Sequence, residues 1–397
     1  MSQVVQDPAD AGREAVQRHA WQEGFDLFKQ ADGAGELSGD DLEVFAEAAL
    51  WSAGFDEFIP LMERAYAAHT RAGNKARAAF VAIHLAHDYS LRLEKSVANG
   101  WLRRAQRLLE EEEEAPEHGY LALELGLRAL SEHDFDRALA EARRAEEIGR
   151  RFGDRALEIR GIQRQGSALI EKGDLEEGRA LLDEASVAAV SGELDPYSTI
   201  VVYCNTIGAC RDVGDFDRAG EWTERASQFC DSHSLSAFPG MCRVNRVEVM
   251  RFRGELLDAR DEADRAGREL RTWNPRVAGA AFYEIGEIRL RLGELAQAEQ
   301  AFREADEFGK DPEPGRSPRL LAKGNVQGAA ASVGGGRTRR RGGAPRPGGR
   351  GRRSDFPAAG GSALAGDRRH ARDRPEPRAP RARPPGRGRR GGGAVGA

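Results

Sequence analysis

Residues Gly293 to Ala305 read GELAQAEQAFREA, and three other stretches of the chain align with them without a gap. They are GDLEEGRALLDEA from Gly173, GDFDRAGEWTERA from Gly214 and GELLDARDEADRA from Gly254. Looser copies begin at His19, Gly54, Leu93 and His133. Successive starting points lie 35 to 41 residues apart. A recurring period of this length is typical of helical-repeat proteins.

Each copy predicts a helix, a turn and a second helix. The glycine that starts the copy supplies a left-handed residue that ends the first helix, and the acid after it favours the start of the second helix. Small residues recur five and twelve positions later, on one face of the second helix. Gly126, Gly166 and Gly286 precede their turns by seven positions and predict close helix approach. The predicted repeat-packing residues are Gly173, Gly214, Ala219, Ala226, Gly254, Ala259, Ala266, Gly293, Ala298 and Ala305.

These hairpins predict an all-α fold. One hairpin cannot bury its own apolar stripe, so stacked copies must share a core. We therefore expect a right-handed superhelix, or α-solenoid, of about eight helix-turn-helix hairpins with a period near ~40 residues. The expected organisation is a disordered N-terminus over residues 1–9, a repeat domain over 10–333 and a disordered tail over 334–397.

The segment Phe282 to Ala305 resembles a tetratricopeptide repeat, with Ile285, Gly286, Gly293, Ala298, Phe302 and Ala305 at that motif's spacing. The period departs from the usual ~34 residues. Longer units of this kind resemble the helical-repeat regions of large bacterial LuxR-type transcription regulators, and Ala219 to Glu255 is the best local match. The resemblance implies a regulatory array that binds a protein or a small effector and precedes a C-terminal helix-turn-helix domain.

The tail has a different composition from the repeats. Its 64 residues from Gly334 hold 18 arginines, no lysine and four acids, so it carries +14, whereas the whole chain carries −5 and residues 1–333 about −19. The repeat register continues to Val333 and breaks at Gly336. Because Gly, Ala, Pro and Arg have GC-rich codons, one hypothesis is a frameshift near residue 334 that removed further repeats and a DNA-binding domain. The alternative is a genuine Arg/Gly tail that binds RNA or DNA phosphates weakly.

Enzyme motifs are missing from the sequence. It has no GxxxxGK[ST] phosphate loop, no HExxH and no GxSxG elbow, so we expect neither an enzyme nor a cofactor. It also has no apolar stretch long enough for a membrane span and no signal-peptide pattern, which predicts a cytoplasmic protein without a membrane partner.

Two groups of residues invite a metal-site interpretation. His84, His87 and Asp88 share one face of a predicted helix, which also carries apolar residues, so we interpret it as a packing helix. The four cysteines lie near His233 but form no CxxC pair, and we expect buried, reduced thiols and no zinc site. They are Cys204, Cys210, Cys230 and Cys242.

The acidic run from Glu110 to Glu114 is interpreted as a solvated helix end.

Arginines mark a candidate binding surface. Arg243, Arg246 and Arg253 cluster on the predicted first helix of the hairpin that turns at Gly254, and first helices line the concave side of tetratricopeptide-like arrays. The candidate surface also includes Glu284 and Glu287 on the next first helix. The competing interpretation is that the three arginines form salt bridges with these two glutamates. The predicted function is a non-enzymatic scaffold or sensor that binds a protein or small effector. Alternatives are a free-standing adaptor and a tail-driven nucleic-acid binder; specific DNA binding by this chain alone is not expected.

Overall fold

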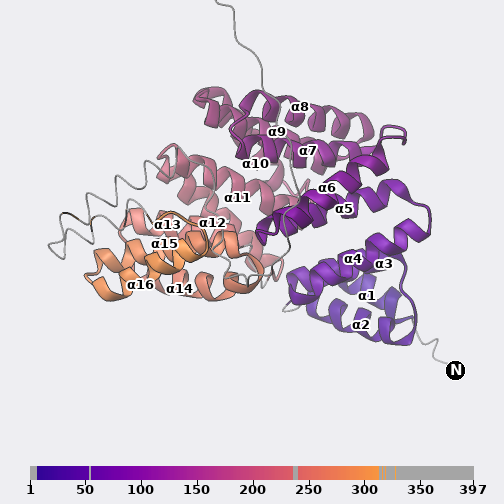
Figure 1. Cartoon of the computed structure of the whole chain (residues 1–397), viewed down its shortest axis with the longest axis horizontal. Helices are drawn as coiled ribbons and strands as arrows, with labels where there is room; N and C mark the ends of the chain where they lie inside the picture. The colour runs from indigo at the N-terminus through magenta and orange to yellow at the C-terminus, as the bar shows by residue number, and fades with distance from the viewer. Residues whose placement is uncertain are drawn as a thin grey trace, which may run out of the picture. The chain divides into compact units, whose positions relative to one another are not determined.

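The computed structural model of the chain describes residues 7–52, 55–235 and 240–312, with Gly315, Pro318 and Gln327 beyond them. These residues form sixteen α-helices and no strand (Figure 1). The first helices of the hairpins are α1 (Pro8–Gln17), α3 (Gly39–Trp51), α5 (Lys75–Leu91), α7 (Pro116–Ser131), α9 (Arg155–Lys172), α11 (Pro196–Asp212), α13 (Gly240–Arg253) and α15 (Pro275–Arg291). The second helices are α2 (Trp21–Ala34), α4 (Phe55–Arg71), α6 (Lys95–Leu109), α8 (Phe135–Phe152), α10 (Leu175–Val190), α12 (Phe216–Ser232), α14 (Leu256–Trp273) and α16 (Leu295–Glu307).

The predicted all-α solenoid of about eight hairpins is confirmed. Helix α1 begins at Pro8, two residues before the expected start of the repeat domain. The expected tail, residues 334–397, and the repeat turn at Gly324 lie outside the described residues. None of the described helices qualifies as a candidate membrane span.

The turns between paired helices have one backbone conformation. The residues that start the repeat copies have positive φ: 103° at Gly173, 75° at Gly214, 86° at Gly254 and 80° at Gly293. His19, Leu93 and His133 adopt it without being glycine, at 59°, 64° and 63°. This left-handed residue ends one helix and lets the chain reverse. The repeat therefore imposes the turn geometry even where the side chain disfavours it.

The acid after the turn acts in two ways. Asp134 and Asp215 cap the next helix, because their carboxylates accept a hydrogen bond from the backbone N–H of Arg137 and Arg218. Asp174, Glu255 and Glu294 make no side-chain cap bond. Their negative charge lies beside the positive end of the helix dipole.

Small residues lie where paired helices approach closely. The alanines five and twelve positions after the turns are buried to 1 % exposure or less: Ala219, Ala226, Ala259, Ala266, Ala298 and Ala305. At Gly166 of α9, an added Cβ would lie 2.9 Å from the backbone oxygen of Gly178 in α10. The two helix backbones therefore touch at this crossing.

Gly166→Ala is expected to lower the free energy of unfolding by about 1–3 kcal/mol, because α9 and α10 must separate to admit the methyl group. Gly100→Ala in α6 is the matched control, since an added Cβ there meets no atom within 4 Å. The control change should instead raise stability by about 0.5–1 kcal/mol, through lower chain entropy in the unfolded state. Urea unfolding followed by circular dichroism measures both. Equal effects of the two changes would contradict close packing at Gly166.

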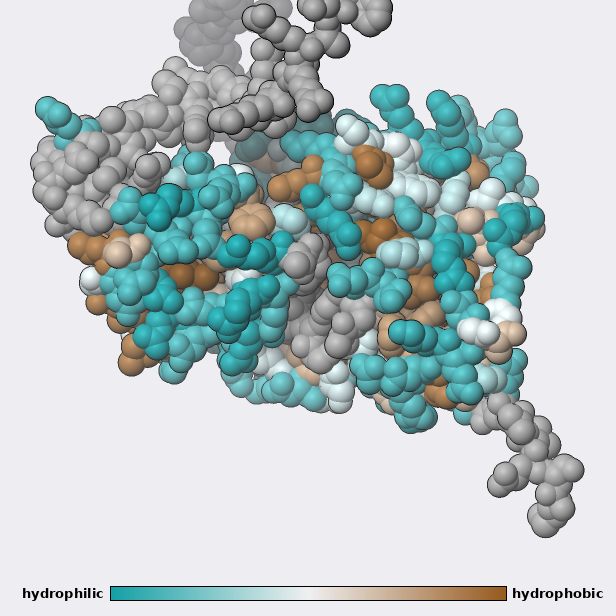
Figure 2. Space-filling view, turned by 60° about the horizontal axis from the view of Figure 1, so that its bottom comes forward, coloured by the Kyte–Doolittle hydropathy of each residue, from teal (hydrophilic) through white to brown (hydrophobic). Residues whose placement is uncertain are grey.

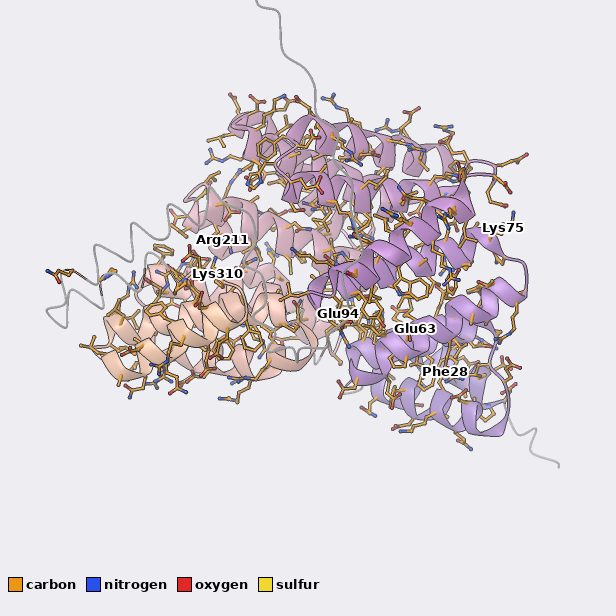
Figure 3. All side chains as sticks on the ribbon, in the orientation of Figure 1. Phe28, Glu63, Lys75, Glu94, Arg211 and Lys310 are labelled. Carbon is orange, nitrogen blue, oxygen red and sulfur yellow. The ribbon has the colours of Figure 1, made fainter. Side chains whose placement is uncertain are left out.

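Segments far apart in the sequence also lie together. The first three hairpins share a core with α11 and the end of α12: Trp21 and Phe28 belong to the same buried cluster as Ile200 and Cys230. Figure 3 labels Phe28 among the helices of the first two hairpins. The indole N–H of Trp21 donates to the carbonyl oxygen of His233 at 2.9 Å. Figure 2 shows hydrophilic residues over most of the visible face, with small hydrophobic patches between them. The array thus brings its first and sixth hairpins into contact.

Candidate functional site

Polar and aromatic side chains from four first helices meet in one place. Helices α5 and α7, α7 and α9, and α9 and α11 are neighbours. The ring of His84 in α5 lies 5.9 Å from the ring of Tyr197 in α11, so the third and sixth hairpins also meet here. We name this group the inner cluster. It consists of His84, His87, Asp88, Tyr120, Glu124, Arg160, Arg164 and Tyr197.

Aromatic rings frame one side of the inner cluster. Phe80 of α5 meets Tyr120 edge-on at 5.0 Å between ring centroids, and His84 lies 4.5 Å from Phe80. The guanidinium carbon of Arg160 lies 5.7 Å from the ring centroid of Tyr120 and 5.5 Å from that of Tyr197. Arg160 therefore makes cation–π contacts with tyrosines of two different helices.

The carboxylate of Glu124 is fully engaged. Its Oε2 lies 3.3 Å from Nδ1 of His87, and its Oε1 accepts a hydrogen bond from Nε of Arg128 at 3.1 Å. Burial alone would raise the pKa of Glu124, but the hydrogen bonds and charges of His87 and Arg128 lower it below its ordinary value. Burial would likewise lower the pKa of His87, yet Glu124 raises it. The two side chains stabilise each other as an ion pair.

Two arginines in the inner cluster have no acidic partner. Arg164 is only 8 % exposed, and its buried Nε has no hydrogen-bond partner. The buried Nε of Arg160 also lacks one. Among the described residues, no carboxylate forms an ion pair with either side chain. Burial and the charge of Arg160 lower the pKa of Arg164 to about 10. An unpaired buried charge is costly, so this pair marks the inner cluster as a candidate site.

Burial also shifts the pKa of two α5 side chains. It lowers the pKa of His84 to about 3, assisted by the positive charge of Arg160. It raises the pKa of Asp88 to about 6. His84 is therefore neutral near pH 7, and a mildly acidic medium neutralises Asp88. Because Glu124 is already paired, the local balance of charge is positive.

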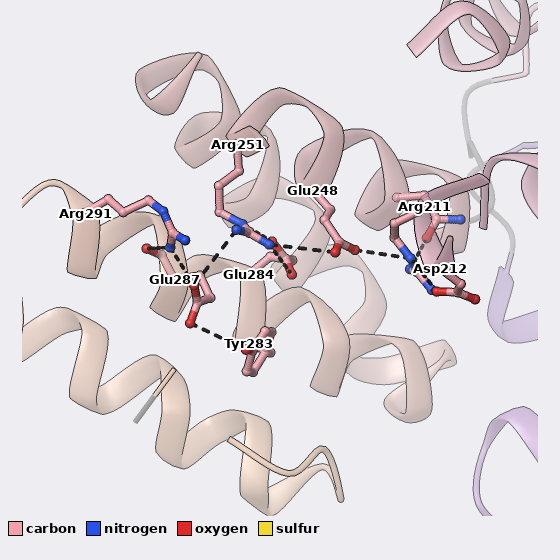
Figure 4. Close-up of polar contacts among 9 residues, drawn as sticks. Arg211, Asp212, Glu248, Arg251, Tyr283, Glu284, Glu287 and Arg291 are labelled. Carbon is pink, nitrogen blue, oxygen red and sulfur yellow. Dashed lines mark hydrogen bonds and ion pairs between the residues drawn. The ribbon is translucent and has the colours of Figure 1, made fainter. Parts of the chain in front are cut away.

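A second polar network follows the first helices α11, α13 and α15 (Figure 4). Arg211 lies 3.4 Å from Glu248, and Nε of Arg251 donates to Oε2 of Glu284 at 2.6 Å. Glu287 lies 3.9 Å from Arg251 and accepts a hydrogen bond from Arg291. Every arginine in this network has an acidic partner, so its positive charges are neutralised within the network. We therefore interpret the network as one that stabilises the packing of α11, α13 and α15.

The predicted arginine surface separates in the structure. Arg243 forms ion pairs with Glu262 and Glu269 on α14, within its own hairpin, at 3.6 and 3.3 Å. Arg246 and Arg253 instead line a shallow groove between α12 and α13.

The expected salt bridges of these three arginines with Glu284 and Glu287 were therefore wrong, because Arg251 makes them. The reason is helical phase: Arg251 and Arg253 lie about 160° apart around the helix. A binding role for the five residues of the predicted surface stays a prediction: Arg243, Arg246, Arg253, Glu284 and Glu287.

Asp40, Glu43 and His69 also bring three possible metal ligands together. Both carboxylate oxygens of Glu43 are already bound by Arg77, at 2.8 and 2.6 Å, and His69 lies 2.7 Å away. A guanidinium in that position repels a metal cation. We therefore interpret this group as an ion-pair network that ties α3 to α4 and α5.

The cysteines depart from the expectation of four reduced thiols. Cys204 is disulfide-bonded, whereas Cys210 and Cys230 are free and buried. The side chain of Cys242 lies outside the described part of the chain. Cys204 lies in α11, which packs on α13, and Asn245 of α13 donates to the Cys204 carbonyl at 3.3 Å.

No family model and no curated protein sequence matches the chain. Solved structures do match. The Rap protein complexed with Competence and Sporulation Factor is 12 % identical, with a TM-score of 0.51 over 86 % of this chain and 98 % of that one. BtubC from P. vanneervenii is 19 % identical, with a TM-score of 0.43 over 57 % of this chain and 99 % of that one. NprR in complex with its cognate peptide NprX is 12 % identical, with a TM-score of 0.46 over 64 % and 76 %. The chain therefore has the fold of tetratricopeptide-like helical-repeat proteins.

Proposed function

We propose that this chain is a non-enzymatic sensor or scaffold that binds a protein segment or small effector on the inner surface of its first helices. The observation that carries the proposal is the inner cluster, where α5, α7, α9 and α11 supply unpaired cations, aromatic rings and a titratable pair. A ligand there would touch four helices of different hairpins at once. Binding would therefore be coupled to the relative positions of those hairpins.

A finer proposal concerns the setting of the array. The segments Phe282 to Ala305 and Ala219 to Glu255 resemble the regulatory region of LuxR-type transcription regulators. In such a setting the array responds to a cytoplasmic effector and controls an attached DNA-binding module. The Rap structure complexed with Competence and Sporulation Factor provides an example of a similar fold with a bound factor. Fold similarity alone does not assign a function, so the proposal rests on the inner cluster.

Peptide selection followed by hydrogen exchange tests the proposed function. The full chain is panned against two random heptapeptide libraries, one rich in acidic residues and one rich in basic residues. Deuterium uptake is then measured with and without the selected peptides. We expect acidic peptides to bind and to slow exchange in residues 75–91, 116–131, 155–172 and 196–212. Failure of both libraries, or protection confined to α10 and α12, would overturn the proposal.

A further inference from the structure

We propose that Arg160 and Arg164 of α9 form a binding site for an oxyanion, either a carboxylate or a phosphate group. The inference rests on the proposed function, because it names the chemical group that the inner surface recognises. The two arginines are four positions apart, so their side chains leave the same face of α9 about one turn apart. Two guanidinium groups so placed can donate several hydrogen bonds to one anion.

The contacts of Arg160 leave its donors available. Tyr120 and Tyr197 interact with the guanidinium through their rings, at 5.7 and 5.5 Å. A cation–π contact is an attraction between charge and ring and does not use the N–H groups of the guanidinium as hydrogen-bond donors. The tyrosines therefore hold Arg160 in place without neutralising its charge.

Two of the acids near the site, Glu124 and Asp154, are bound by other groups. Glu124 is bound by His87 and Arg128. Asp154 accepts a hydrogen bond from the Tyr120 hydroxyl at 3.0 Å and caps α9 by accepting one from the N–H of Leu157 at 2.9 Å. Glu124 and Asp154 thus have their own donors, and Asp88 forms no ion pair with either arginine among the described residues, so a ligand is the expected source of an anion for the arginines.

Three arginines of α11, α13 and α15 have acidic partners, whereas the two arginines of the proposed site have none among the described residues. Arg211, Arg251 and Arg291 lie near the C-terminal ends of their first helices, and each has an acid within ion-pair distance. The tail from Gly334 is not a suitable occupant, since its charge of +14 has the same sign as the arginines. An external anion fits the site better than any segment of that tail.

Isothermal titration of the full chain with inorganic phosphate and with benzoate tests the site, with benzamide as the neutral counterpart of benzoate. We expect one of the two anions to bind at millimolar concentration and benzamide not to bind. Arg164→Gln and Arg160→Gln should each weaken anion binding about tenfold or more. Arg143→Gln makes the same charge change at an exposed position on α8 and should leave the affinity unchanged.

Folding is checked by circular dichroism, and Arg164→Lys keeps the charge while removing the planar fork. An intermediate affinity of this variant supports recognition by the guanidinium geometry. Absence of anion binding, or equal affinity in the wild type and both glutamine variants, would overturn the site. If the selected peptides protect α5, α7, α9 and α11 equally well in the wild type and in Arg164→Gln, the sensor function stands and the oxyanion site fails. If phosphate binds through Arg164 but no peptide binds, the oxyanion site stands and the proposed sensor function fails.

Discussion

Arg251→Met is expected to lower the free energy of unfolding by about 3–5 kcal/mol. The Arg251 side chain is 5 % exposed and pairs with Glu284, whose side chain is also 5 % exposed. Burial would lower the pKa of Arg251, but Glu284 and Glu287 raise it, so the guanidinium is firmly charged. Methionine keeps the apolar stem and leaves the buried carboxylate of Glu284 without its cation, whereas Glu287 retains Arg291. Urea unfolding near pH 7, followed by circular dichroism, measures the loss.

Arg253→Met on the same helix is the matched control. Arg253 is exposed and, among the described residues, forms no ion pair, so its replacement should change stability by less than about 0.5 kcal/mol. If both variants lost the same stability, the network from α11 to α15 would not be what holds these helices together.

His84→Gln is expected to remove part of the acid sensitivity of the fold. Burial lowers the pKa of His84 from 6.5 to about 3, so the unfolded chain takes up a proton at a higher pH than the folded chain does. His84 therefore costs no stability above about pH 6.5 and lowers stability as the pH falls toward about 3. Between about pH 7.5 and pH 4.5 the loss amounts to about 2–3 kcal/mol. Denaturant unfolding at both pH values should show the variant losing that much less than the wild type.

Other groups titrate in the same interval, which is why the difference between variants matters. Glu124, whose pKa is lowered in the fold, also makes the fold less stable as the pH falls. Asp88 and His87, whose pKa values are raised, make the fold more stable as the pH falls. His133→Asn is the control, because His133 is exposed and asparagine tolerates its left-handed backbone. A variant at position 84 with the same pH profile as the wild type would show that His84 is hydrated in the fold.

Local structure could be predicted from the sequence because it depends on short spacings. The repeat identifies the turn residues even at Leu93 and His133, where the usual glycine is missing. It also places the alanines of the second helices at buried positions, since seven residues make about two helical turns. These properties require only the period of the helix and the length of the hairpin.

The inner cluster could not be predicted in the same way. His84 and Tyr197 are separated by 113 positions, and they meet only because the array curves until α5 and α11 touch. Sequence spacing identifies the face of one helix but not this curvature. Two signals were available: His84, His87 and Asp88 share one face of α5, and Arg160 and Arg164 lie on the largely buried helix α9. The error over Arg253 and Arg251 has a different cause, the helical phase that directs Arg251 toward Glu284.

The stability of Arg164→Met in buffer free of phosphate and carboxylates shows whether Arg164 is kept for a ligand. If it is, its buried, unpaired charge opposes folding. Methionine retains the apolar stem and removes that charge. The predicted result is a free energy of unfolding that is equal to the wild type or higher by about 1–3 kcal/mol. A loss of about 1 kcal/mol or more would show that Arg164 stabilises the fold, and would contradict the account.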